Sequence, residues 1–594
     1  MTSLRARRAW QSNSKRLLAG SPHRVIFERL RKTSSQVSRN DLSTMKELVK
    51  DKIITAVKMA GVDDLVDFNV DCPPDAKMGD WSTNVAMILA SEKKQNPREI
   101  AEKIISRLGD DKEIKKAEIA GPGFINITLD EKIYYEKLKE VLEQADHFGK
   151  IEQGHGKKIS IDYVSANPTG PVHIGNARGG PVGEALARIF EWSGNTVSRD
   201  YYLNDTGVQT KRLGESIYYY LEKNLGKEAE LPEDGYQGAY IEEVYKDIIE
   251  KYKSELDEIK EREDIVEFLR VKGLEILVEG MKEDLSLINI EYDNWYSQTE
   301  IQKSGETKKV IEDLTKAGST VSREGALWFV NPSDPEFEDR ESVLVKSDDK
   351  TLTYFADDIA FHMMRYREGT DKIFDLFGPN HDGHVARMKS STKVLGIKDE
   401  RLEILLYQWV RIKNGDELVS MSKRQGNFVT LRQVLESGVE ADAFKYLILA
   451  QNLNTPLDFD LKLAKDRSDK NPVYYIKYAH ARICSIIRRA KSDGVEESGK
   501  ADLTKLSDTK ELALIRELVK LPNIVSEIND SFQIQALPHY AYKIAKLFHD
   551  FYSSCQVLSD DKELTASRLL LVHSAKIVLK NVLEIMAIDA PEKM

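Results

Sequence analysis

The sequence predicts an α/β protein of several domains, in which a split, doubly wound sheet lies between an N-terminal α+β domain and a C-terminal all-α helical bundle. Strand and helix patterns alternate from about residue 151 to residue 459, as a doubly wound sheet requires. Only two glycines follow Asp460, and apolar residues such as Leu514 and Leu518 recur there at helical spacing. The length of 594 residues suits three or four domains of about 150 residues each.

Composition limits the class of protein. Apolar residues make up 41% of the chain and charged residues 31%, which is enough for sizeable cores. No apolar run approaches the ~18 residues of a membrane span, so we expect no membrane association. The three cysteines, Cys72, Cys484 and Cys555, form no CxxC pair, so we expect neither disulfides nor zinc, and a reducing, cytoplasmic location.

The whole-chain net charge of −11 argues against a protein that coats DNA, although local Lys and Arg stripes can still hold a selected RNA. Residues 1–40 differ, with ten basic residues and one acid, Glu28. This composition is typical of a transit peptide, but it also fits a disordered basic tail or an upstream extension. We favour a disordered leader over residues 1–44, with organellar import as the alternative, because a clean amphipathic helix begins at Met45.

Residues 45–150 are expected to form the α+β domain. A helix from Met45 to Val57 is followed by a turn and helix N-cap at 79–84. A second turn then leads into a strand that contains Phe124 and Asn126, and a charged helix at 131–144 ends the domain.

The domain at 151–459 opens with a predicted strand, Lys158 to Val164, a turn, and a helix that Gly194 stops. A polar insertion of about 214–343 interrupts the alternation, and the pattern resumes with a strand at 373–377, a turn at 378–384, a helix to Leu395 and a strand at 402–408. The remaining residues, 460–594, form the helical domain.

The turn after the first strand carries the clearest chemical signal. It contains neither GxGxxG nor GxxxxGK[ST], so neither a dinucleotide fingerprint nor a P-loop is supported. It does contain several glycines, together with His173 and Asn176 at the mouth of the next helix. Glycines let a nucleotide lie against the backbone, and the two side chains can face phosphate charge. A second segment, 421–426, presents Lys423 in a loop that ends in glycine, which suits a clamp on pyrophosphate.

Together these segments resemble the paired His-Ile-Gly-His and Lys-Met-Ser-Lys-Ser signatures of class I aminoacyl-tRNA synthetases. The stretches "SANPTGPVHIGNARGG", "TYFADDIAFH", "AGPGFIN", "NPVYYIKYAHARI" and "APEKM" look like the arginyl-tRNA synthetase family specifically, from about Met45 to Met594. Asn176 stands in place of the second histidine of the first signature. Ser420 and Arg424 replace the outer Lys and Ser of the second.

The resemblance implies ligation of L-arginine to tRNA(Arg) through an arginyl-adenylate, with release of AMP and pyrophosphate. ATP would be a substrate with Mg²⁺, and we expect a monomer. Catalytic roles are implied for His173, Asn176 and Lys423, because adenylation depends on positioning and on charge stabilisation at phosphate. The implied ATP contacts are His173, Gly175, Asn176, His384, Met421, Ser422 and Lys423.

Arginine would be held by acids, since carboxylates are the natural acceptors of a guanidinium fork. The resemblance places Asp162, Tyr354 and Asp358 around the side chain, and Ser165, Asn167 and His381 near the α-amino group. Tyr354 and Asp358 are four residues apart in a predicted helix and therefore share a face. The alternative is that both aspartates are ordinary surface acids and that Tyr354 edges a core.

Two further clusters suit RNA. Phe124 could stack on a splayed-out base while Asn126 bonds its edge, or Phe124 could be core. The resemblance implies the tRNA D-loop as the target. An aromatic and basic cluster that suits an anticodon loop, or simply helix packing, opens the helical domain. Its members are Tyr474, Tyr475, Tyr478, His480 and Arg482.

Three rival functions stay open. Another class I synthetase or a HIGH-type nucleotidyltransferase shares the signatures, but the helical C-terminal domain disfavours the latter and the two acids favour arginine. A tRNA-binding module without activity is disfavoured by the intact His173 and Lys423. A metal hydrolase at His381 and His384 would need further ligands, and no Cys/His cluster accompanies them.

Overall fold

The computed structural model describes residues 44–61, 66–332, 342–347, 351–415, 417–419, 429–495 and 501–594. The basic leader, apart from Thr44, and the second signature at 421–426 therefore lie outside the described residues. The chain divides into two compact units, one ending at Asp130 and one running from Glu131 to Met594. Each unit is described by itself.

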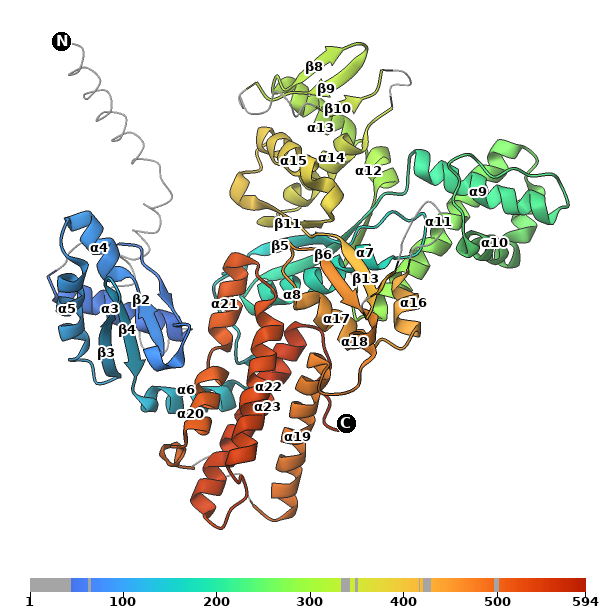
Figure 1. Cartoon of the computed structure of the whole chain (residues 1–594). Helices are drawn as coiled ribbons and strands as arrows, with labels where there is room; N and C mark the ends of the chain where they lie inside the picture. The colour runs from blue at the N-terminus through green and yellow to red at the C-terminus, as the bar shows by residue number, and fades with distance from the viewer. Residues whose placement is uncertain are drawn as a thin grey trace, which may run out of the picture. The chain divides into compact units, whose positions relative to one another are not determined.

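The described part of the first unit is a four-stranded antiparallel sheet with three helices, drawn in blue in Figure 1. The sheet order is β1-β2-β4-β3. Its first helix begins where the sequence predicts, because the Thr44 side chain and Glu47 form a capping box. The elements are α3 (Met45–Met59), β1 (Val70–Asp71), β2 (Trp81–Thr83), α4 (Val85–Lys93), α5 (Pro97–Leu108), β3 (Ile114–Ala120) and β4 (Phe124–Leu129). The predicted turn at 79–84 thus contains a short strand.

Helix α6 (Glu131–Gln144) has the predicted bounds but belongs to the second unit rather than to the N-terminal domain. Its apolar face, which includes Leu138 and Val141, is fully buried, and the helix packs against α20 and α23 of the C-terminal bundle. The Tyr135 hydroxyl donates to the carbonyl of Leu506 at 2.7 Å. The sequence pattern gives the buried face of an amphipathic helix but not the partner that covers it.

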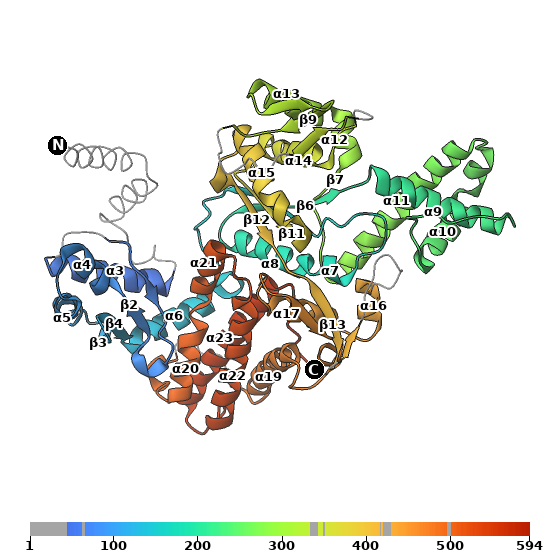
Figure 2. The same cartoon turned by 45° about the horizontal axis from the view of Figure 1, so that its top comes forward.

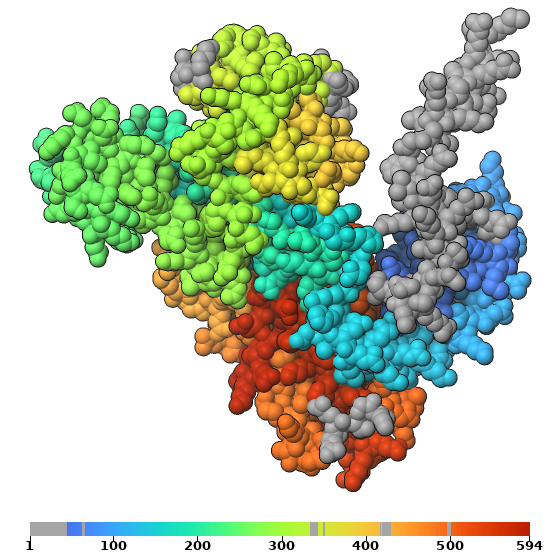
Figure 3. Space-filling view, turned by 180° about the vertical axis from the view of Figure 1, so that it is seen from behind, coloured from blue at the N-terminus to red at the C-terminus, as the bar shows by residue number. Residues whose placement is uncertain are grey.

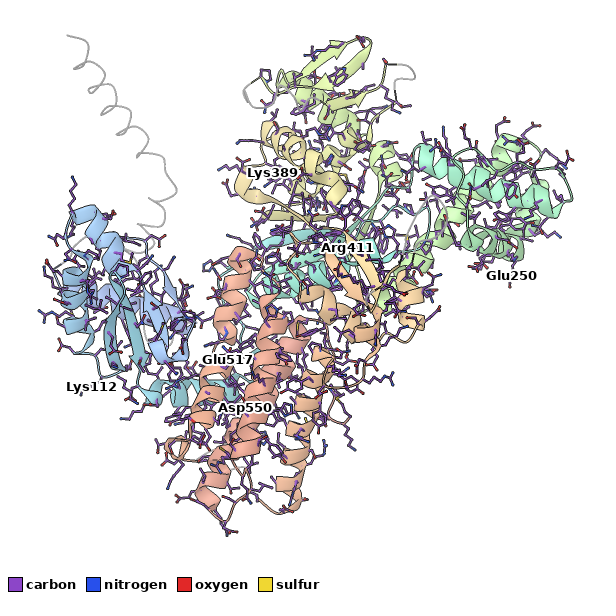
Figure 4. All side chains as sticks on the ribbon, in the orientation of Figure 1. Lys112, Glu250, Lys389, Arg411, Glu517 and Asp550 are labelled. Carbon is purple, nitrogen blue, oxygen red and sulfur yellow. The ribbon has the colours of Figure 1, made fainter. Side chains whose placement is uncertain are left out.

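The second unit is built on a five-stranded parallel sheet with the order β12-β11-β5-β6-β7. Its strands are β5 (Lys158–Tyr163), β6 (Thr196–Leu203), β7 (Asn294–Ser297), β11 (Lys372–Phe377) and β12 (Leu402–Leu406). Figures 1 and 2 show α8 (Gly179–Trp192) on one face and α14 (Tyr354–Arg367) and α15 (Asp382–Val394) on the other. Lys389 of α15, labelled in Figure 4, pairs with Glu403 of β12 at 3.9 Å. The chain leaves β5 towards β6 on one side and returns to β11 on the other, so the order reverses between β5 and β11, where such sheets bind ligands.

The range predicted as one insertion, 214–343, contains strand β7 of this sheet. Before β7, helices α9 (Val208–Asn224), α10 (Ala239–Glu258) and α11 (Arg262–Ser286) pack around their own apolar cluster. They form the separate green lobe of Figure 3. After β7 come α12 (Gln298–Ser304), α13 (Glu306–Lys316) and a small antiparallel sheet of β8 (Thr320–Arg323), β9 (Ala326–Phe329) and β10 (Ser342–Val345). A strand of four residues is too short to show the alternation of apolar and polar residues by which strands are predicted from a sequence.

A second small sheet, ordered β14-β13-β15, connects to the helical domain. It comprises β13 (Val410–Asn414), β14 (Glu417–Val419) and β15 (Leu457–Asp460), and Arg411, labelled in Figure 4, bonds Asp458 across it at 2.6 Å. Three short helices, α16 (Leu431–Glu436), α17 (Ala441–Leu449) and α18 (Leu461–Lys465), lie along this stretch. The predicted bundle follows as α19 (Pro472–Ser492), α20 (Thr509–Leu518), α21 (Leu521–Ser531), α22 (Ala536–Ser554) and α23 (Lys562–Ile585). None of the described helices is long and apolar enough to cross a membrane.

Candidate active site

A cavity of about 560 Å³ opens at the carboxyl ends of β5 and β11, where the strand order reverses. Ten of the residues that the sequence singles out line it. They are Asp162, Ser165, Asn167, His173, Gly175, Asn176, Tyr354, Asp358, His381 and His384. The other three residues predicted for the ATP and arginine sites, Met421, Ser422 and Lys423, lie outside the described residues. Asp162 and Tyr354, which are 192 residues apart in the sequence, therefore line the same cavity.

The turn after β5 is sharply bent at the cavity edge. Val164 and Ser165 both have positive φ, 69° and 33°, which is costly for a β-branched residue and is typical of functional sites. The bend returns the Ser165 hydroxyl onto Asp162, to which it donates at 2.6 Å. The backbone N–H of Tyr202 donates to the same carboxylate oxygen at 3.1 Å and to Ser165 Oγ at 3.0 Å. Asp162 is thereby fixed at the floor of the cavity, 2% exposed.

Helix α14 supplies the opposite wall. Tyr354 and Asp358 both face the cavity, as their spacing predicts, and Tyr354 is 60% exposed. Nε2 of the buried His384 lies 3.1 Å from an Asp358 carboxylate oxygen, and the ring packs on Tyr354 at 6.2 Å between centroids. His381 is exposed at the rim, where partial burial of its ring, and then the neighbouring His384, lower its pKa. A carboxylate and two imidazoles therefore share this side of the cavity.

The first signature lies at the other end of the cavity. His173 caps the short helix α7 (Ile174–Ala177), and its Nδ1 accepts from the Asn176 N–H at 3.2 Å. Residues 172–174 pair with 429–431, through Ile174 N–H to the Val429 carbonyl at 3.1 Å and Leu431 N–H to Val172 at 2.8 Å. The chain that follows the second signature is thus bonded directly to the first.

Sequence reasoning missed the buried charges behind this cavity. Arg365 donates to Asp375 at 2.8 Å, and His362 Nε2 lies 2.6 Å from the other oxygen of that carboxylate. Burial raises the pKa of Asp375, but Arg365 and His362 outweigh this effect and lower it to about 2. Burial, and then the charge of Asp375, raise the pKa of Asp162 to about 7. The sequence did contain one signal for these charges: His362 and Arg365 follow Asp358 by four and seven residues, a spacing that puts them on one face of a helix.

Arg178, the last residue of the first signature turn, is also fully buried. Its guanidinium donates to the carbonyls of Gln408 at 2.6 Å, and of Asn452 and Thr455 at 3.0 Å each. Gln408 and its neighbour Trp409 line the cavity, and neither was singled out from the sequence. Arg178 therefore connects the first signature to a wall of the cavity that is formed by residues some 230 positions further along the chain.

The predicted RNA contacts lie elsewhere. In the first unit, Phe124 and Asn126 share one face of β4, with Phe124 38% exposed, while Ile125 and Ile127 on the other face are fully buried. The aromatic side chain of Phe124 is therefore not part of that core.

In the second unit, the predicted cluster on α19 is only partly a surface. The Arg482 guanidinium lies over the Tyr478 ring at 4.8 Å and Tyr478 is 43% exposed, whereas Tyr474 is half-buried. His480 departs from the expected cluster, because it is buried with Nδ1 2.9 Å from the Pro591 carbonyl. Its helical position turns it towards the C-terminal tail instead. Among the described residues, no group of three or more His, Cys, Asp or Glu side chains is arranged to hold a metal.

Three family models match the chain. The model for the "Arginyl tRNA synthetase N terminal domain" matches residues 43–129, and the "DALR anticodon binding domain" matches 476–594. The model for "tRNA synthetases class I (R), catalytic domain" matches 137–458, which is more than half of the chain. The chain belongs to the arginyl-tRNA synthetase family. The family matches agree with the order of the three predicted domains.

Individual relatives agree with this assignment. The Arginine--tRNA ligase of Staphylococcus aureus strain Mu3 is 38% identical over 558 residues, which cover 93% of this chain and 100% of the relative. Two solved arginyl-tRNA synthetases share the fold. The structure from Thermus thermophilus has a TM-score of 0.73 at 22% identity, and that from Plasmodium falciparum 0.70 at 19%. Each comparison covers 93% of this chain and the whole of the other.

Proposed function

We propose that this member of the arginyl-tRNA synthetase family joins L-arginine to tRNA(Arg) in two steps. The arginine carboxylate attacks the α-phosphate of ATP, which enters as its Mg²⁺ complex, to give arginyl-adenylate and pyrophosphate. A ribose hydroxyl at the tRNA terminus then attacks the acyl carbon and releases AMP. One observation carries the proposal: acids suited to a guanidinium and a signature suited to phosphates line the same cavity.

The residues of the cavity have distinct proposed roles. Asp162 and Asp358 accept the guanidinium, with Tyr354 beside them, and Ser165, Asn167 and His381 lie towards the α-amino group. His173, Gly175 and Asn176 face the phosphates, because an imidazole and an amide at a helix start can donate to developing charge. Lys423 is proposed to hold the pyrophosphate, and His384 to contact ATP. Catalysis would then consist of positioning the substrates and stabilising charge in the transition state, since adenylation needs no covalent intermediate with the enzyme.

The tRNA contacts remain proposals of the same kind. Phe124 presents an exposed ring beside Asn126 on β4, which suits a stacked base with a hydrogen bond to its edge. Tyr478 and Arg482, with Tyr474 nearby on α19, offer stacking and positive charge for an anticodon loop. The monomeric state and the cytoplasmic location stay predictions.

The deciding experiment is ATP–pyrophosphate exchange that depends on arginine, run with and without tRNA. We expect exchange with arginine and no exchange with other amino acids. The family resemblance also leads us to expect that exchange appears only when tRNA(Arg) is present and weakens with salt, because the grip on tRNA is largely phosphate charge. Exchange with arginine alone would refute the coupling to tRNA but not the ligase. No arginine-dependent exchange under either condition would refute the proposed function.

A variant of the pocket sharpens this test. Asp358→Asn keeps the shape and removes the charge, and loss of a charged partner in a desolvated pocket costs about 2–5 kcal/mol. The KM for arginine should rise accordingly while the KM for ATP stays near its wild-type value. Asp399→Asn, an exposed acid paired with Lys393, is the control and should change neither. Equal losses for both substrates in Asp358→Asn would indicate a folding defect and remove the residue from the pocket.

A further inference from the structure

Three aspartates form a continuous row across the middle of the sheet. Asp375 of β11 is paired in register with Asp162 of β5, which is paired in register with Asp200 of β6. All three side chains are buried, with exposures of 0%, 2% and 1%. Like charges on adjacent strands repel, and burial makes each charge costlier, so this aspartate row needs nearby cations or protons.

Helix α14 provides two basic side chains, Arg365 and His362, and both lie towards one end of the row. Arg365 donates to Asp375 at 2.8 Å and to the Ser160 hydroxyl at 3.3 Å, and Ser160 in turn donates to Asp200. His362 lies 2.6 Å from Asp375 through Nε2 and 2.6 Å from the Asp358 carbonyl through Nδ1. Each ring nitrogen of His362 therefore faces an oxygen, and one of these oxygens belongs to the aspartate row.

Arg365 and His362 both bond Asp375, and neither forms a hydrogen bond with Asp162 or Asp200. Of these two acids, only Asp162 lines the cavity. Its direct partners are neutral: the Ser165 hydroxyl and the Tyr202 N–H. The charged and titratable groups around it are Asp375 from β11, Asp200 from β6, Arg365 and His362 from α14, and the phenols of Tyr201 and Tyr292.

The pKa of Asp162 follows from its burial and from these neighbours. Burial, and then Asp375, raise its pKa to about 7, while Arg365 and Ser165 act in the opposite direction. A proton held by the carboxyl at this position removes one of the three like charges of the row without any ligand. The same carboxyl faces the cavity, where a ligand can supply the missing cation.

We propose that Asp162 gives up a proton when a guanidinium enters the cavity, so that the aspartate row selects a cationic side chain over a neutral one of the same shape. The O–H bond of the carboxyl breaks, the proton passes to the buffer, and the guanidinium stays protonated throughout. Arg365, His362 and Asp375 are positioning residues that act through Asp162. The inference rests on the proposed function, since it takes arginine as the substrate.

Citrulline is the matched neutral ligand, because its ureido group has the shape of the guanidinium without the charge. A protonated Asp162 can donate to the ureido oxygen, whereas an ionised Asp162 favours the cation. The preference for arginine over citrulline should therefore grow as the pH rises from about 6 to about 8 and level off above that range.

The test is isothermal titration of the full chain, with and without tRNA(Arg), with arginine and with citrulline, in phosphate and in MOPS, whose ionisation heats differ. At about pH 6.5 we expect arginine to release close to one proton per site, less at pH 8, and citrulline to release none. Arginine binding with no more proton release than citrulline at either pH would overturn the inference while leaving the proposed function intact. Absence of arginine binding both with and without tRNA(Arg) would overturn both.

Two variants separate charge from structure. Asp200→Asn removes a negative neighbour and should move the midpoint of proton release to lower pH. Ser165→Ala removes a hydrogen bond to the carboxylate and should move the midpoint to higher pH. Asp399→Asn is the matched exposed control and should leave the midpoint unchanged. A defect of packing has no reason to produce shifts of opposite sign, so equal or same-direction shifts would overturn the role of the row.

Discussion

Two buried arginines lie behind the two ends of the cavity, and their surroundings differ completely. Arg365, behind the end proposed to bind arginine, is surrounded by carboxylates. Burial lowers its pKa, but Asp375, Asp162 and Asp200 outweigh this effect and raise it. Arg178, behind the end proposed to face the phosphates, donates to backbone carbonyls, and burial lowers its pKa to about 10. The first arginine sets the charge of neighbouring groups, whereas the second holds separate chain segments in place.

Removing Arg365 should produce the largest loss of stability. Arg365→Met leaves buried carboxylates without their cation, which costs about 3–5 kcal/mol in the free energy of unfolding. Adding Asp375→Asn to the same chain should restore part of the loss, because it removes one uncompensated charge. Urea midpoints at fixed pH measure both effects. A double variant less stable than Arg365→Met would contradict the charge argument.

Removing Arg178 should cost less, and no acid substitution should rescue it. Arg178→Met leaves buried carbonyls without donors, at about 2–3 kcal/mol. Arg178→Lys keeps the charge but lacks the planar fork that reaches Gln408 and Asn452 together, so it should recover less than half. Because Gln408 lines the cavity, the KM for ATP should also rise, with no change in its pH dependence. Full recovery in Arg178→Lys would show that charge, rather than geometry, matters here.

The pH dependence of stability distinguishes the two ends in the unliganded protein. The folded-state pKa of Asp162 is raised to about 7 from an ordinary value of 3.8, so the folded protein holds a proton that the unfolded chain has lost between those values. This proton stabilises the folded state fully at pH values below 3.8. The stabilisation is lost as the pH rises to about 7, and the free energy of unfolding then falls by up to about 1.4 kcal/mol per pH unit.

Asp162→Asn should therefore flatten this part of the stability curve, measured as urea midpoints between about pH 4 and pH 7.5. Arg178→Met should keep the wild-type slope, since no titrating acid depends on Arg178. A wild-type slope in Asp162→Asn would show that another group is responsible.

The difference between local and long-range contacts explains what could be predicted from the sequence. The strand end and the turn glycines locate His173, because these features are local. Asp162, Tyr354 and Asp358 follow from the resemblance to the family's motifs, and helix spacing adds that Tyr354 and Asp358 share a face. The cavity therefore contains every predicted residue that the structure describes for the ATP and arginine sites.

Pairing across the sheet is different. Asp162, Asp200 and Asp375 look like ordinary acids in the sequence, and only the strand register makes them neighbours. The partners of Arg178 lie 230 to 277 residues away along the chain. Such contacts depend on the global fold and leave no local pattern, which is also why the partner of α6 could not be foreseen.

The smallest predicted effect concerns Tyr240, a neutral side chain that donates to a backbone carbonyl, as Arg178 does. The Tyr240 hydroxyl, from the α9–α11 lobe, donates to the Thr169 carbonyl of the first signature segment at 3.1 Å. Tyr240→Phe removes this neutral hydrogen bond but keeps the ring beside Gly170, so the expected cost is about 0.5–1.5 kcal/mol. Amide hydrogen exchange across 165–178 should quicken by roughly two- to tenfold.

Tyr220→Phe, in the same apolar cluster but with no hydroxyl bond to a described residue, is the control and should leave exchange unchanged. If Tyr240→Phe equalled Arg178→Met in its effect, the charge on Arg178 would add nothing to its anchoring role, and the contrast between a neutral and a cationic donor would fail.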